Sequence, residues 1–213
     1  MPKNKNKPIF NFNLPQFTQI SESHCGPAVT QMLLSFLGTS VSQEAVAELG
    51  GAKDLIELNG MRVDQLALAV HKLAPQYFFW FKEHSTLTEL TAIIRQHGYP
   101  VGVEWQGVFD DPEEEEDEDD DDYGHYSVVI QVYPRKKELV IADPYKDYIS
   151  QARVFSFEEF DQRWYDYNEI VDPKTGKTYL KKDDHMMFLI APLKEIFPLK
   201  FGMERYFKDE VQE

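Results

Sequence analysis

The 213-residue chain is predicted to fold as an α+β domain, because helical patterns fill its first half and antiparallel strand patterns its second. Up to residue 98, most apolar residues recur at helical spacing and are bounded by capping residues and glycines. From Pro100 onward, short runs rich in Val, Ile and aromatic residues follow one another across turns, which indicates strands. At this length, a single domain with a substantial core is the simplest organisation.

The first predicted helix begins near Gly26-Pro27-Ala28 and continues as an apolar-periodic run to Leu37. Pro27 suits a first helical turn, where its missing N–H is not needed, and Gly38 suits the residue just past the helix end. Cys25, the only cysteine of the chain, therefore falls at the helix N-terminus. The helix dipole and the unpaired main-chain N–H groups favour a thiolate there.

Further helices are expected before residue 98. Ser40 and Gln43 form a capping box for a short second helix, and residues 51–59 connect it to the third. A capping box of Thr86 and Glu89 precedes the fourth helix. The third helix has an apolar face formed by Val63, Leu66, Ala67, Val70 and Leu73.

The second half of the chain is predicted to contain an antiparallel hairpin. Residues 126–133 form its first strand, residues 134–137 its turn and residues 138–143 its returning strand. Other strands are expected at residues 77–81, 100–105 and 186–190, and a short helix capped by Ser156 and Glu159 precedes the last of these.

An acidic run dominates the charge of the chain. Twelve charges of the net −15 lie in residues 110–122, which leaves −3 for the remainder. Like charges at this density repel one another, so we expect a disordered, solvated loop that could also contact a basic partner or cations. The nearly neutral remainder argues against nucleic acid as a partner.

Composition also bears on location. No stretch approaches the roughly 18 apolar residues of a transmembrane helix, and residues 1–8 are basic without the apolar core of a secretory signal. A single unpaired cysteine without a signal peptide is typical of a reducing setting. We therefore expect a cytoplasmic protein with no membrane partner. No histidine shows a defensible metal-ligand spacing, and no cofactor is expected.

The sequence offers each group that a thiol nucleophile needs: a base, a residue that orients the base, and donors for an oxyanion. His125, at the start of the first hairpin strand, is the candidate base. Asp143 closes the returning strand, so both lie near one end of the sheet, and Asp143 could accept the imidazole Nδ1–H. The Gln19 amide, six residues before Cys25, could donate to an oxyanion beside the Cys25 main-chain N–H.

Each of these residues also has a simpler structural explanation. A lone cysteine often fills space in a core, and a histidine at a strand start is often structural. Asp143-Pro144 is also a common opening of a turn. His24 is interpreted as an exposed neighbour of Cys25 rather than a base, because adjacent residues at a helix start point in different directions.

Taken together, the motifs resemble the papain-like cysteine peptidases of the bacteriocin-processing type, which cleave leader peptides after a double glycine. The resemblance runs from about Leu14 to Trp164. It rests on Gln19 followed after five residues by Cys25-Gly26-Pro27-Ala28, on Gly124-His125-Tyr126-Ser127-Val128-Val129 and on Ala142-Asp143-Pro144. One departure is His24, where the family often has an aspartate.

The resemblance implies one papain-like peptidase domain over residues 1–213. An acidic insertion at about 110–122 and a C-terminal extension from about residue 166 depart from the family pattern. It implies a peptide or protein substrate. By the same likeness, Cys25 is the nucleophile, His125 the general base and acid, Asp143 the orienting residue and Gln19 the oxyanion donor.

Three functions remain open on this scaffold. The first is a thiol-dependent peptidase, in which attack on a peptide or amide carbonyl gives an acyl-enzyme that water resolves. The second is a catalytically inactive, peptidase-like module that binds a partner in its cleft or on its acidic loop. The third is an acyl-transfer enzyme with transglutaminase-like or amidase-like activity.

Overall fold

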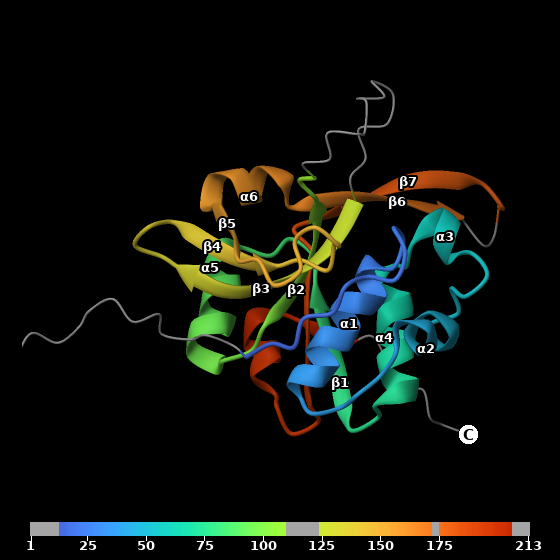
Figure 1. The fold of residues 1–213 in the computed structure, drawn as a ribbon, viewed down its shortest axis with the longest axis horizontal. Helices are drawn as coiled ribbons and strands as arrows, with labels where there is room; N and C mark the ends of the chain where they lie inside the picture. The colour runs from blue at the N-terminus through green and yellow to red at the C-terminus, as the bar shows by residue number, and fades with distance from the viewer. Residues whose placement is uncertain (1–12, 110–123, 172–174, 206–213) are drawn as a thin grey trace, which may run out of the picture.

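The structure is a computed structural model that describes residues 13–109, 124–171 and 175–205. The acidic run expected to form a disordered loop lies outside these residues. Within them, an antiparallel sheet of seven strands runs through the molecule, and helices cover both of its faces (Figure 1).

The helices match most of the boundaries expected from the sequence. They are α1 (Cys25–Phe36), α2 (Gln43–Leu49), α3 (Ile56–Asn59), α4 (Val63–Leu73), α5 (Leu87–Ala92), the π-helix η1 (Ile93–His97), α6 (Phe157–Arg163) and the 3₁₀-helix η2 (Phe197–Phe201). Gly38 and Gly98 follow helix ends with φ of 83° and 72°, a left-handed conformation that glycine adopts without strain.

The strands include all those expected and several more. They are β1 (Tyr77–Lys82), β2 (Val101–Gln106), β3 (Gly124–Tyr133), β4 (Glu138–Ala142), β5 (Arg153–Ser156), β6 (Tyr165–Val171), β7 (Thr178–Asp184), β8 (Met187–Pro192) and β9 (Glu204–Arg205). The main sheet has the order β5-β4-β3-β2-β8-β1-β9. Because β8 lies between β2 and β1, the segment after residue 166 contributes a central strand of the sheet.

Alternation along the strands separates two cores. On β1, Phe79 packs on the side of α1, α2 and α4, whereas Trp80 packs on the side of α5 and α6. On β3, Val128 and Val129 divide in the same way. Successive strand residues point to opposite faces, so an apolar run such as β8 fills both cores at once.

Local contacts correct two expectations. Ser42, not Ser40, caps α2, and its hydroxyl accepts a 3.2 Å hydrogen bond from the Ala45 N–H. The side chain of Gln43 is buried and reaches Ile20, Thr18 and Gln31 instead of capping the helix. Residues 51–59, expected as a connection, also contain the short helix α3.

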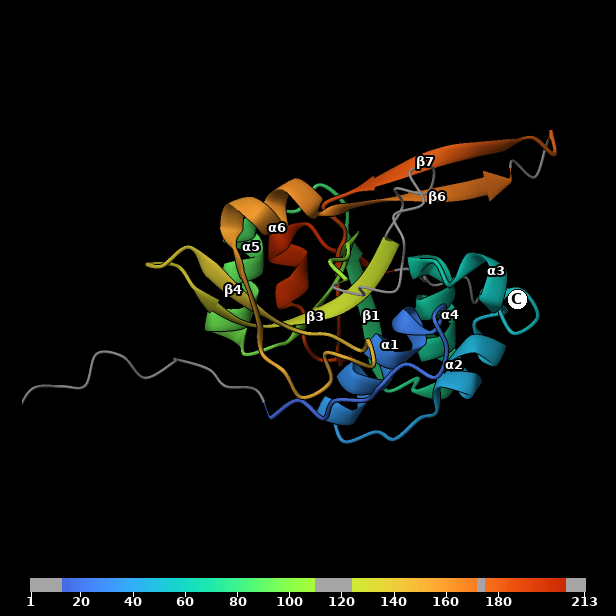
Figure 2. The ribbon, with the colours of Figure 1, turned by 45° about the horizontal axis from the view of Figure 1, so that its top comes forward.

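A two-stranded ribbon of β6 and β7 is the main element that the sequence patterns did not predict. It projects beyond the main sheet on the side of α3 (Figure 2). Tyr167, Tyr179 and Leu180 are exposed on it, which explains why no clear inside-outside alternation marks these strands. At its base, β6 packs against β2 and β3.

Candidate active site

Cys25 is the first residue of α1, as the sequence predicted. Its exposed fraction is 9%, and it borders the core between α1 and the sheet. The first helical hydrogen bond runs from the Ala28 N–H to the His24 carbonyl, at 3.0 Å. The main-chain amides of Cys25 and Gly26 therefore precede the helical hydrogen-bond ladder, at the positive end of the helix dipole.

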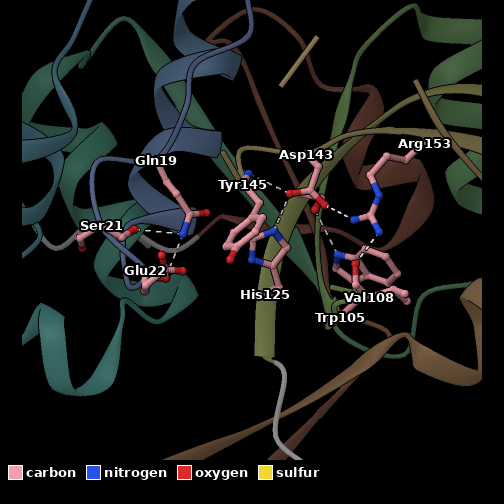
Figure 3. A network of polar contacts seen from close by, with 10 residues as sticks. Gln19, Ser21, Glu22, Trp105, Val108, His125, Asp143, Tyr145 and Arg153 are labelled. Atoms are coloured by element: carbon pink, nitrogen blue, oxygen red, sulfur yellow. Dashed lines mark hydrogen bonds and ion pairs between the residues drawn. The ribbon is translucent and has the colours of Figure 1, made fainter. Parts of the chain in front are cut away.

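His125 and Asp143 meet at one end of the β3–β4 hairpin, as the sequence predicted. Val128 pairs with Ala142 across the two strands, which brings the start of β3 beside the end of β4. The His125 Nε2 lies 2.8 Å from the Asp143 Oδ1 (Figure 3). Both side chains are buried.

The ring nitrogen facing Asp143 differs from the expected one. Asp143 was expected to accept from Nδ1, but it contacts Nε2. The physical reason is reach: Nε2 lies at the far tip of the imidazole and extends to the neighbouring strand end. Nδ1 is thus the ring nitrogen that Asp143 leaves available, and Cys25 is near enough to raise the pKa of His125.

A main-chain hydrogen bond joins the two halves of the site. The Gln19 N–H, in the loop before α1, donates to the Pro144 carbonyl, in the loop after β4, at 2.9 Å. Since Cys25 follows the first loop and Asp143 precedes Pro144, this bond fixes the thiol-bearing helix against the end of the hairpin. Gln19 and Pro144, which are 125 positions apart in the chain, are thereby brought together.

The buried pair carries opposite charges. Burial by itself lowers the pKa of His125, but the Asp143 charge and hydrogen bond, together with Cys25, raise it to about 10. Burial would raise the pKa of Asp143, yet His125, the Tyr145 N–H and Arg153 lower it to about 2. At neutral pH, an imidazolium therefore faces a carboxylate on one side and the Cys25 side chain on the other.

Arg153 is the polar residue of the site that the sequence analysis missed. Its Nη1 lies 2.6 Å from the Asp143 Oδ2, and its Nη2 donates to the Val108 carbonyl (Figure 3). The side chain comes from β5, which pairs with β4 beside Asp143. A four-residue strand next to a tight loop leaves little pattern in the sequence, and the arginine itself is the only available signal.

An aromatic ring covers part of the His125 side chain. Phe109 meets His125 edge to face, with ring centroids 5.1 Å apart, and contacts Tyr145 at 4.9 Å. Such rings exclude water and lower the local dielectric, which strengthens the interaction between His125 and Asp143.

Gln19 lies in the loop that leads into α1, and its side-chain amide already makes two hydrogen bonds within that loop. Its Nε2 donates to the carbonyls of Ser21 and Glu22, both at 3.0 Å (Figure 3). These two bonds use both amide hydrogens. Donation to an oxyanion therefore requires one of the two loop hydrogen bonds to be exchanged.

The expectation that His24 is exposed was wrong. His24 is buried, its Nδ1 lies 2.6 Å from the Ser21 hydroxyl, and Glu57 of α3 is 3.6 Å away. The Ser21 hydroxyl also contacts the Glu57 carboxylate at 2.9 Å. The helix α3 therefore packs against the loop that carries His24.

A second polar network adjoins Cys25 through Tyr126. A Cβ placed on Gly26 would lie 3.2 Å from the Tyr126 ring, so this ring packs directly on the residue after Cys25. The Tyr126 hydroxyl donates to the fully buried Glu104 at 2.5 Å. Asn168, on the β6–β7 ribbon, also reaches Glu104 at 3.4 Å. The network thus connects the ribbon to the wall of the site.

The described residues contain neither a metal-binding cluster nor a membrane-spanning helix. No group of three or more His, Cys, Asp or Glu side chains among them is arranged to hold a metal ion. In the same part of the chain, no helix combines the length and apolar character required to cross a membrane.

Comparison with solved structures supports the fold. The peptidase domain of Streptococcus ComA, a bi-functional ABC transporter in a quorum-sensing pathway, has a TM-score of 0.53 at 20% identity, covering 85% of this chain and 98% of that one. A structure described as a C39-like peptidase from Bacillus anthracis has a TM-score of 0.56 at 16% identity, covering 86% and 97%. A double-glycine-motif protease from an AMS/PCAT transporter, in complex with the leader peptide, has a TM-score of 0.52 at 16% identity, covering 85% and 94%.

At these identities the likeness establishes the fold, and it confirms the predicted α+β class with helices packed on an antiparallel sheet. The search among curated proteins returned no match. A family model described as the Peptidase C39-like family matches residues 12–171. Since this match spans well over half of the 213 residues, the chain belongs to the Peptidase C39-like family.

Proposed function

We propose that the chain is a thiol-dependent peptidase that hydrolyses a peptide or amide bond through an acyl-enzyme on Cys25. The observation that carries this proposal is the arrangement of Cys25, His125 and Asp143: His125 and Asp143 are 2.8 Å apart, and Cys25 is near enough to His125 to raise its pKa. Membership of a peptidase family supports the same reaction class.

In the proposed reaction, the Cys25 thiolate attacks the carbonyl carbon and forms a C–S bond. The His125 imidazolium then gives its Nδ1 proton to the leaving amine as the C–N bond breaks. Neutral His125 next takes a proton from water, and the resulting hydroxide attacks the thioester. The C–S bond breaks, which releases the acid and restores the thiolate. Asp143 keeps the imidazole oriented throughout.

A positively charged His125 supports the first step. Because the pKa of His125 is raised to about 10, the imidazolium persists at neutral pH and carries the proton that the leaving amine requires. A thiol nucleophile must stay reduced, which agrees with the proposed cytoplasmic setting. A peptide substrate is proposed because a protease of the same fold is in complex with a leader peptide.

The first prediction concerns alkylation of Cys25. At about pH 6, less than about 1% of an ordinary thiol is ionised, so glutathione reacts slowly with iodoacetamide. Cys25 is expected to react at least about tenfold faster than glutathione at this pH, and His125→Ala is expected to remove the advantage. Because the chain holds one cysteine, the intact mass reports the adduct without ambiguity, and Cys25→Ser is the blank.

Turnover separates the three functions left open by the sequence. A fluorescence-quenched peptide library should be cleaved by the wild type and not by Cys25→Ser. Fast alkylation without cleavage would favour a binding module. Incorporation of a fluorescent amine into the peptides, in place of hydrolysis, would favour acyl transfer. Alkylation no faster than that of glutathione would contradict the proposed activation of Cys25.

A second prediction tests Gln19 as an oxyanion donor. Gln19→Ala is expected to lower the rate of peptide hydrolysis by about 100-fold, because the oxyanion develops only in the tetrahedral intermediate. Alkylation by iodoacetamide forms no oxyanion and should change little. If both rates fall together, Gln19 acts by shaping the loop before Cys25, in line with its bonds to Ser21 and Glu22.

A further inference from the structure

The Asp143 carboxylate is shared between two cationic groups. Its Oδ1 accepts from the His125 Nε2 at 2.8 Å and from the Tyr145 N–H at 3.0 Å. Its Oδ2 accepts from the Arg153 Nη1 at 2.6 Å. Rotation of the carboxylate toward or away from His125 would break the bond to Arg153, so the guanidinium fixes the plane in which His125 is held.

The guanidinium is itself held from several sides. Its Nη2 donates to the Val108 carbonyl, and its plane lies over the Tyr148 ring with the central carbon 3.7 Å from the ring centroid. The main chain of Arg153 pairs with Ile141 of β4. The side chain is 10% exposed. A planar group with these contacts is held rigidly. A lysine ammonium cannot reproduce both the forked hydrogen bonds to Asp143 and Val108 and the contact with the Tyr148 ring.

The bond to Val108 extends the anchor to the other side of His125. Phe109 follows Val108 and meets the His125 ring edge to face. One guanidinium therefore positions the acceptor of the His125 Nε2–H and also the segment that carries the aromatic cover of the ring.

We propose that Arg153 is a positioning residue for the proposed peptidase reaction, which fixes the Asp143 carboxylate and, through it, the His125 ring toward Cys25. The proposal rests on the proposed function. It assigns Arg153 no contact with substrate. At metal sites, mutation of the residues that orient a ligating histidine typically costs about 10- to 100-fold in affinity or activity, and Arg153 is placed to act on His125 in a comparable way through Asp143.

The direction of a pH shift distinguishes positioning from a simple charge effect. If Arg153 acted only as a nearby positive charge, its removal would stabilise the His125 imidazolium, and the alkylation profile would move to lower pH. If Arg153 positions Asp143, its removal loosens the acceptor of the Nε2–H. The imidazolium–thiolate pair then weakens, and the profile moves to higher pH.

The test is the rate of iodoacetamide alkylation of Cys25 against pH in Arg153→Met and Arg153→Lys. Arg153→Met is expected to lower the rate at about pH 6 by about tenfold or more and to move the profile to higher pH, with Arg153→Lys intermediate. Arg135→Met is the matched control, since Arg135 is exposed in the turn at the opposite end of the hairpin. Thermal melts identify variants that fail to fold, and Arg153→Lys alone then decides.

The outcomes keep the two proposals apart. Suppose that the wild type is alkylated fast and that the pH profile of Arg153→Met is unchanged or moves to lower pH. This result overturns the positioning role of Arg153 and leaves the peptidase proposal standing. Wild-type behaviour of Arg153→Lys also overturns it, because charge alone would then suffice. A wild type no faster than glutathione contradicts the peptidase proposal itself.

Discussion

Replacing Asp143 with alanine is expected to lower the free energy of unfolding by about 3–5 kcal/mol at pH 7, because it leaves the buried Arg153 guanidinium without its counter-ion and removes the carboxylate that stabilises the His125 imidazolium. Asp143 is fully buried and contacts His125 and Arg153 at 2.8 and 2.6 Å. For a domain of this size, the loss corresponds to a fall of about 10 °C in Tm. Urea-induced unfolding and thermal melts measure both quantities.

The pH dependence of this effect has a defined sign. The pKa of Asp143 is lowered from 3.8 to about 2, so its stabilising contribution is complete above about pH 4 and is lost as the pH falls toward 2. The pKa of His125 is raised from 6.5 to about 10, so its contribution is complete below about pH 6 and is lost as the pH rises through 10. The difference in unfolding free energy between wild type and Asp143→Ala should therefore be largest between about pH 4 and about pH 6.

Two further variants separate the loss of charge at Asp143 from the loss of any carboxylate in this loop. Asp143→Asn keeps the size of the side chain and one acceptor oxygen, so it isolates the lost charge and should be less destabilised than Asp143→Ala. Asp147→Ala removes an exposed carboxylate from the same loop and is expected to change stability by less than about 0.5 kcal/mol. Equal effects of Asp143→Ala and Asp147→Ala would contradict the proposed importance of the buried ion pairs.

The parts of the site that the sequence predicted are those set by local signals. Pro27 and Gly38 delimit the first helix, and this places Cys25 at its N-terminus. The hairpin needs only a four-residue turn to place His125 near Asp143. In both cases, the relevant contacts form between residues of one helix or one hairpin, where periodicity and turn chemistry carry the information.

The parts that the sequence did not predict depend on contacts between distant segments. His24 is buried because Glu57, on a four-residue helix with no periodicity to detect, packs against its loop. Arg153 reaches Asp143 only because β5 adds to the edge of β4. The choice of the Nε2 atom of His125 depends on a side-chain rotamer, for which no sequence pattern exists. Ser42 caps α2 in place of the expected Ser40, and the Gln43 side chain contacts the distant Thr18 carbonyl instead of completing a capping box.

Glu104 shows the same dependence on long-range packing and has a measurable consequence. It lies on β2, fully buried, with Tyr126 of β3, Asn168 and Asp166 of β6, and Asp183 of β7 around it. Burial raises the pKa of Glu104 from 4.5 to about 7; the hydrogen bond from Tyr126 opposes the rise and the charge of Asp183 adds to it. The folded protein therefore retains a proton that the unfolded chain releases.

The wild type is expected to lose stability as the pH rises from 4.5 to about 7, and Glu104→Gln is expected not to show this loss. Between pH 4.5 and about 7, the folded state binds the extra proton, so the unfolding free energy of the wild type falls across this window. The raised pKa corresponds to about 3 kcal/mol. Glutamine stays neutral, so the stability of Glu104→Gln relative to wild type should increase by about this amount from pH 4.5 to above pH 7. Urea unfolding at a series of pH values measures the difference.

Tyr126→Phe gives a second, directional test of the same carboxyl. The Tyr126 hydroxyl donates to Glu104 and favours its ionised form, so removing the hydroxyl should raise the pKa of Glu104 further. The pH window in which stability falls should then move upward in Tyr126→Phe and disappear in the double variant with Glu104→Gln. Glu138→Gln, at the start of β4 and only partly buried, is the matched control, because it removes a carboxylate outside the buried network of Glu104. Parallel pH curves for wild type and Glu104→Gln would show that Glu104 is not the carboxyl that titrates in this range.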